Sequence, residues 1–74
     1  MNKDAIANRL IELRGSKSRE EVATACDISV SALAMYEQGQ RIPRDDIKIR
    51  LASYYKRTVQ FIFYNKNDTL SDTG

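Results

Sequence analysis

Apolar residues at helical spacing mark the first segment of the chain. Ile6, Leu10 and Leu13 stand four and three positions apart, and an α-helix brings residues at that spacing to one face. We therefore predict a helix over about residues 4–14 that is buried along this stripe. Gly15 follows it, and a glycine in that place commonly ends a helix.

The stretch from residue 18 to 39 predicts two short helices joined by a tight turn. Ser18 and Glu21 have the spacing of a capping box, which satisfies free backbone N–H groups at the start of a helix. Ser29 is the expected N-cap of the second helix, and that helix ends near Gly39. Two such helices have the outline of a helix-turn-helix.

The C-terminal half predicts one long helix and one short one. Ile47, Leu51 and Tyr55 are four positions apart, which favours a helix over about residues 44–57 with one buried stripe. A short fifth helix is expected over residues 59–64. The fold class predicted is therefore all-α, a compact bundle of five helices.

Length and composition indicate a single small domain. The chain has 74 residues, of which 42% are hydrophobic and 30% charged. We expect a folded domain over residues 1–64 and a flexible tail or linker stub over the polar residues 65–74. No apolar run approaches membrane-spanning length and no signal-peptide pattern opens the chain, so a cytoplasmic location is the expectation.

The inventory of reactive side chains argues against an enzyme. The chain has no histidine and one cysteine, Cys26, which fits a small core residue. It also lacks a glycine-rich phosphate loop, so we expect no catalytic residue, no metal and no cofactor. The net charge of +2 is small for a nucleic-acid binder, and any positive surface must be local.

Three segments together resemble the Cro/phage-repressor class of helix-turn-helix regulators, also called the xenobiotic-response-element type. They read NRLIELRGSKSREEVA, DISVSALAMYEQGQRIP and LASYYKRTVQFIF, and lie within residues 5–63. The resemblance implies a lambda-repressor-like bundle whose helix-turn-helix, about residues 18–39, binds double-stranded operator DNA. Such domains usually bind as a homodimer.

The chain departs from the family pattern in the helix-turn-helix itself. Arg19 stands where a glutamine often opens the first helix of the pair. Asp27 stands where a glycine is usual, so its backbone must accept a left-handed conformation, which Asp tolerates better than most residues. The connection before residue 18 is about two residues shorter than is common in the family, and Arg57 replaces a usual valine.

The resemblance also assigns DNA contacts. Carried over by position, the base-reading residues are Val30, Ser31, Ala34 and Met35. Apolar side chains there can touch thymine methyl groups and the serine hydroxyl can bond to base edges. A plain apolar surface is the alternative reading.

Phosphate contacts fall on both sides of the proposed groove helix. The candidates are Arg19, Ser29, Gln38, Gln40 and Arg41. For the two arginines the alternative is an ordinary solvated cation.

Two further pairs have expected roles away from the bases. In the family an acid at the position of Glu37 pairs with an arginine at that of Arg14, so we expect an ion pair that is at least partly buried. Phe61 and Tyr64 are unusually aromatic for a chain end and form a candidate dimer patch. Packing against the first or the fourth helix is the alternative for these rings.

The function expected is a sequence-specific transcriptional regulator, a repressor of phage, mobile-element or bacterial type. An antitoxin with a protein partner, or the DNA-binding half of a longer repressor, would fit the same pattern. From a different class, a protein-interaction module of the same fold fits the apolar face and the low net charge. Salt-sensitive binding to duplex DNA separates these classes.

Overall fold

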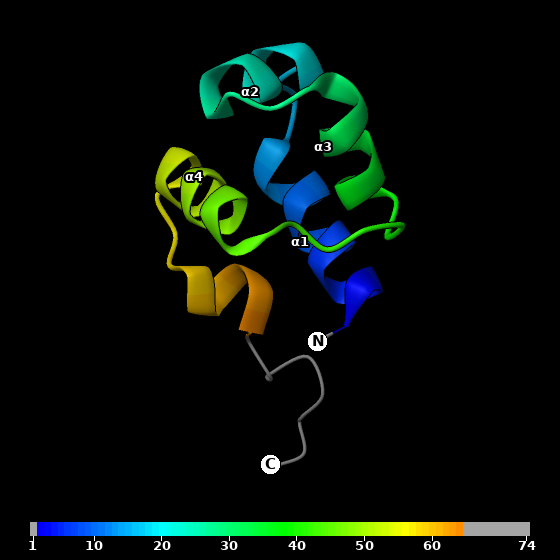
Figure 1. Ribbon diagram of the computed structural model, residues 1–74, viewed down its shortest axis with the longest axis vertical. Coiled ribbons are helices and arrows are strands. Elements are labelled where there is room, and N and C mark those ends of the chain that lie inside the picture. The colour runs from blue at the N-terminus through cyan, green and yellow to red at the C-terminus, as the bar shows by residue number, and fades with distance from the viewer. Residues whose placement is uncertain (1, 65–74) are drawn as a thin grey trace.

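The computed structural model describes residues 2–64, which form an all-helical domain (Figure 1). In chain order the elements are α1 (Lys3–Arg14), α2 (Arg19–Cys26), α3 (Val30–Glu37), α4 (Asp45–Tyr55) and the π-helix η1 (Gln60–Tyr64). The predicted all-α, five-helix fold is confirmed. Met1 and the predicted tail 65–74 lie outside the described residues.

Both helices of the central pair begin at a serine, as the sequence predicts. The Ser18 hydroxyl oxygen accepts a hydrogen bond from the Glu21 N–H at 3.0 Å, and the Ser29 hydroxyl oxygen accepts one from the Ala32 N–H at 3.0 Å. Each serine satisfies one backbone donor that a helix start leaves free. The Ser18 cap fixes where α2 begins, and the Ser29 cap fixes where the turn between α2 and α3 ends.

Asp27 forms the turn between the two helices in the left-handed conformation expected of it. Its φ and ψ are 59° and 46°, a region that costs most L-residues energy and that Asp tolerates better than most. The next N–H, that of Ile28, donates to the Ala23 carbonyl at 3.0 Å. The chain therefore reverses within three residues, and α3 leaves α2 at a fixed angle.

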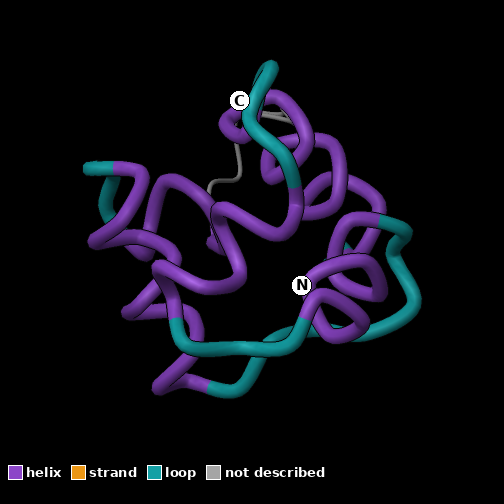
Figure 2. The backbone as a smooth tube through the Cα atoms, turned by 90° about the horizontal axis from the view of Figure 1, so that it is seen from above, coloured by secondary structure: helices purple, strands orange, loops and turns teal. Residues whose placement is uncertain are grey.

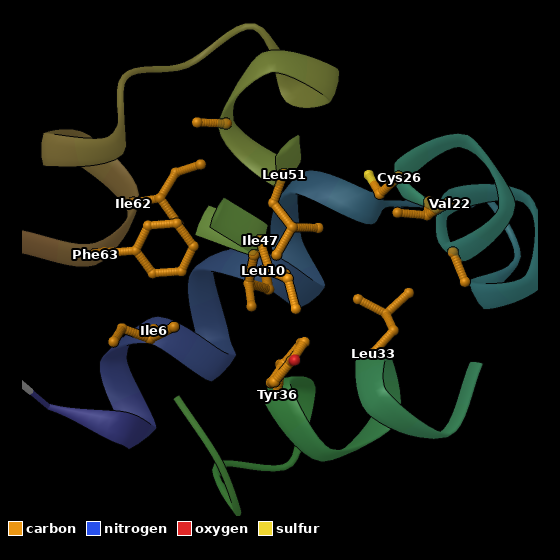
Figure 3. Close-up of a cluster of buried hydrophobic side chains, with 12 residues drawn as sticks. Ile6, Leu10, Val22, Cys26, Leu33, Tyr36, Ile47, Leu51, Ile62 and Phe63 are labelled. Carbon is orange, nitrogen blue, oxygen red and sulfur yellow. The ribbon is translucent and has the colours of Figure 1, made fainter. Parts of the chain in front are cut away.

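One core joins all five helices (Figure 3). Its side chains with less than 2% exposure come from every element, and the largest are Ile6, Leu10, Val22, Leu33, Leu51 and Ile62. In Figure 1, α1 runs through the middle of the domain, with the α2–α3 pair at one end and α4 and η1 on one side. Burial of this shared apolar surface holds the helix pair on its scaffold.

The fifth helix covers the expected segment 59–64, since Val59 is already helical. What the sequence did not indicate is its hydrogen bonding, which over Gln60–Tyr64 is that of a π-helix. Thr58 starts it, because its hydroxyl oxygen accepts from the Phe61 N–H at 2.9 Å. So short a segment makes too few internal bonds to set its own geometry. The burial of Ile62 and Phe63 in the core decides it instead.

Short loops join the helices, as Figure 2 shows from above. Residues 38–44 link α3 to α4, and Gly39 passes close to the start of α1. A Cβ at Gly39 would lie 3.0 Å from the Asp4 carboxylate, and its φ is +73°. Glycine therefore suits this position on both backbone and steric grounds.

Candidate nucleic-acid interface

The outer side of α3 carries the candidate base-reading residues. Val30 is 41% exposed, Ser31 is exposed, and Ala34 and Met35 are partly exposed. The opposite side of α3 is buried through Leu33, Tyr36 and Glu37. The helix therefore has one face in the core and one face of small and apolar side chains that is turned outward and at least partly exposed.

The candidate phosphate contacts lie at both ends of that helix. Gln38, Gln40 and Arg41 are exposed just after its C-terminus, and Ser29 is exposed at its start. The Ser29 oxygen already accepts the Ala32 N–H, but its O–H remains available as a donor. This arrangement suits a helix whose two ends approach the two phosphate backbones of a groove.

Glu37 joins the end of α3 to α1 and α2 through two arginines. Its Oε2 accepts from Arg14 Nε and its Oε1 accepts from Arg19 Nε, both at 2.8 Å. The Glu37 side chain has no exposed surface. The hydrogen bond to Glu37 raises the pKa of Arg14 above its usual value. The structure thus brings Arg14 and Glu37 together, and it adds Arg19 to them.

A shallow depression lies beside this triad. It is lined by Arg14, Ser18, Arg19, Glu20 and Val30. A phosphate candidate from α2 and the first base-reading candidate of α3 therefore share one concave surface. The depression also contains an acid, Glu20, whose charge opposes an approaching phosphate.

Comparison with known proteins decides the family. A family model described as helix-turn-helix matches residues 9–62. The chain belongs to this helix-turn-helix family, of the Cro/phage-repressor type. It is a family of DNA-binding transcription regulators. No significant match to the chain was found among the curated proteins or among the solved structures.

Two further observations on this helix-turn-helix domain concern metal sites and membrane-spanning helices. Over residues 2–64, no group of three or more His, Cys, Asp and Glu side chains is placed to hold a metal ion. None of the helices in that range has the length and apolar character needed to cross a bilayer.

The contact between Arg19 and Glu37 is the feature of the helix-turn-helix that the sequence interpretation missed. The sequence predicts a phosphate contact for Arg19, with a solvated cation as the alternative, and neither role includes a partner within the protein. The replacement of the family's usual glutamine by Arg19 is the signal that could have found it. A long side chain at the start of α2 can reach the carboxylate at the end of α3.

The aromatic residues of η1 are partly packed and partly exposed. Phe61 is 41% exposed with the Arg57 guanidinium 5.9 Å from its ring centroid, and Tyr64 is 38% exposed. Lys48 of α4 donates to the Tyr64 hydroxyl at 2.8 Å. That hydrogen bond raises the pKa of Lys48. The sequence left open a dimer patch or packing on a neighbouring helix, and Tyr64 has both an α4 contact and free surface.

Ile49 is an exposed apolar residue that the sequence reading did not single out. It is 61% exposed on the outer side of α4. Its position off the stripe of Ile47 and Leu51 is the pattern that indicates this exposure.

Replacement of Arg41 tests the phosphate contacts. We expect Arg41→Ala to reduce the slope of log K against log[salt] by about one unit for each bound protomer on any duplex, because each protomer neutralises one fewer phosphate. Binding isotherms over a salt series measure it. Arg57→Ala is the matched control, because this exposed arginine belongs to the segment between α4 and η1. Figure 1 shows that segment on the opposite side of the domain from α3, so the salt slope of this variant should stay that of wild type. An unchanged slope for Arg41→Ala would remove that residue from the contact set.

Proposed function

We propose that this helix-turn-helix domain is a sequence-specific binder of double-stranded operator DNA that acts as a repressor of phage, mobile-element or bacterial type. The observation that carries the proposal is the outer side of α3. Val30 and Ser31 are exposed there, and Ala34 and Met35 are partly exposed. Exposed polar residues flank this side at both ends of α3, and the cation Arg41 is exposed after its C-terminus. A repressor of this kind acts by occupying its operator and blocking polymerase.

In the proposed complex α3 lies in the major groove with its N-terminal turn nearest the bases. Val30, Ala34 and Met35 contact thymine methyl groups, and the Ser31 hydroxyl bonds to base edges. Because three of these four side chains have no strong hydrogen-bond donor, direct readout is limited and the shape of the DNA supplies part of the specificity.

Phosphate contacts hold α3 in register in this proposal. Arg19 approaches one backbone from the start of α2, where free N–H groups also favour an anion. Gln38, Gln40 and Arg41 approach the other from the loop after α3. Such contacts are independent of sequence and give binding its dependence on salt.

A homodimer on a two-fold operator is the assembly we propose, with Phe61 and Tyr64 as the contact. Both rings are more than a third exposed on the last described helix. The mass of the protein, measured with and without operator DNA, tests this. A Phe61→Ala change should weaken dimer formation while leaving the helical content unchanged. A single copy per duplex in both proteins would remove the dimer from the account.

Selection of bound duplexes from a random pool tests the function itself. We expect the wild-type chain to enrich one motif with two-fold symmetry, and its affinity for that motif to fall steeply with salt. Enrichment of no motif, with binding equal on all duplexes, would contradict sequence-specific regulation.

The exposed apolar side chains of α3 favour one competing function. Val30 is 41% exposed, and an apolar face on a domain of net charge +2 also suits contact with a protein. A protein-interaction module of the same fold would use such a face. A salt titration separates DNA binding from protein binding. The affinity of a duplex binder falls as the salt concentration rises, because counterions compete for the phosphates, whereas the affinity of an apolar protein contact does not.

Met35 gives the sharpest test of base readout. We expect Met35→Ala to relax the preference at one base position of the selected motif and its symmetry mate, with other positions retained, because an apolar contact with one base is shortened. A second selection with the variant measures it. Equal loss of affinity on all sequences would show that Met35 acts on the fold rather than on a base.

A further inference from the structure

The two arginines that share Glu37 are not equivalent. Arg14 uses its Nε for Glu37 and its Nη1 for the Lys17 carbonyl, at 2.8 Å each, and its side chain is 18% exposed. Arg19 makes only the Nε bond to Glu37, and its side chain is 36% exposed. Arg14 is therefore engaged inside the protein, whereas Arg19 keeps its two terminal nitrogens without a partner among the described residues.

The geometry of a guanidinium makes this difference useful. The group is planar and rigid, and its five N–H donors point in fixed directions. A carboxylate that holds the Nε side of Arg19 therefore also fixes where the two terminal nitrogens point. Those nitrogens belong to a residue that lines the depression beside Val30. They form the fork that binds a phosphate through two parallel hydrogen bonds.

We infer that Glu37 is a positioning residue for DNA binding, which holds Arg19 as a preformed clamp for one DNA phosphate next to the first turn of α3. The inference rests on the proposed function and adds to it a role for a residue that touches no DNA. Arg14 is the second cation bound to the Glu37 carboxylate. With two arginines and one glutamate, the three side chains carry a net charge of +1 at this surface.

Preorganisation gives the expected size of the effect. An arginine that is already held loses less side-chain freedom on binding, and the freedom of one long side chain corresponds to roughly two- to tenfold in affinity. The charge of Glu37 acts in the opposite direction, because removing an acid near DNA favours binding. A double-mutant cycle separates the two, since the charge effect is present whether or not residue 19 is an arginine.

The cycle uses the full chain with Arg19→Gln, Glu37→Gln and the double variant, on one selected duplex at fixed salt. Measurements are made at low temperature, where circular dichroism verifies that each protein is helical. We expect Glu37→Gln to be roughly two- to tenfold more unfavourable for binding in the presence of Arg19 than in the Arg19→Gln background. No coupling, or coupling of the opposite sign, in which Glu37 withholds Arg19 from DNA, would overturn the inference.

Arg19→Lys tests the same point without disturbing the Arg14–Glu37 contact. Lysine keeps the charge but not the planar fork. We expect the salt slope of wild type together with an affinity about three- to tenfold lower. Wild-type affinity for this variant would overturn the inference even where Glu37→Gln does not fold. If the wild-type protein itself shows no salt-sensitive duplex binding, the proposed function fails. If the wild-type protein binds DNA but substitution of residue 19 has no effect on affinity, only the inference about Arg19 fails.

Discussion

Glu37→Gln should lower the free energy of unfolding by about 3 kcal/mol, because it removes the acidic half of a buried ion pair. The Glu37 side chain is fully buried, and each of its oxygens accepts one arginine Nε at 2.8 Å. A glutamine retains a single acceptor oxygen and turns an NH₂ group toward one guanidinium. The two arginines would then face each other without a counter-charge. For a domain of this size the melting temperature should fall on the order of 15 °C.

Glu12→Gln is the matched control for that change. It makes the same chemical substitution on α1 at an exposed side chain, and we expect a change within about 0.5 kcal/mol. Thermal unfolding of both variants, followed by circular dichroism without DNA, measures the difference. Equal melting temperatures for wild type and Glu37→Gln would mean that the triad is peripheral to the fold.

Ile62→Ala should destabilise the domain by about 2–4 kcal/mol, because it leaves a cavity where η1 closes the core. Ile62 has no exposed surface, and its carbonyl accepts from the Arg9 guanidinium at 2.8 Å. The backbone carbonyl of Ile62 therefore ties the last described helix to α1, and Ile62→Ala removes only the buried side chain. Denaturant unfolding gives the free energy and its dependence on denaturant.

Phe61→Ala is the neighbouring comparison. Its ring is 41% exposed, and we expect a loss of less than about 1 kcal/mol in the monomer. The two substitutions are at adjacent positions of η1, so the difference between their losses in free energy of unfolding shows which side of the helix packs inward. Similar losses for both would place Phe61 in the core and withdraw it from the proposed dimer patch.

The parts of the fold that depend on neighbouring residues were predictable from the sequence. The stripe of Ile6 and Leu10, and the serines that start α2 and α3, are local patterns, and each is present in the structure. The left-handed turn at Asp27 was predicted because the family has glycine there, and its φ of 59° confirms it.

The parts that depend on three-dimensional packing were not predictable in the same way. No pattern in the sequence singles out Lys48, yet this residue is only 5% exposed. Its aliphatic stem is covered, while its Nζ donates to the Tyr64 hydroxyl and lies 4.8 Å from the centroid of the Tyr64 ring. Long side chains can bury their stems in this way once a partner lies within reach, and that partner is set by where η1 docks.

The contact of Arg19 with Glu37 has the same origin. The two residues are 18 positions apart, and they meet only because the turn at Asp27 sets the angle between α2 and α3. Sequence spacing fixes neither that angle nor the reach of an arginine. The base-reading and phosphate residues, by contrast, were carried over from family positions and stay predictions until DNA binding is measured.

Replacement of single thymines by uracil in the selected duplex tests most directly whether the outer side of α3 lies in the major groove. Uracil pairs as thymine does but lacks the methyl group that α3 is proposed to contact. We expect about a fourfold loss of affinity at each contacted position, the value of one buried methyl group. Met35→Ala should abolish that loss at one of them. Affinity that is unchanged at every replaced thymine would contradict the proposal that this apolar face reads bases.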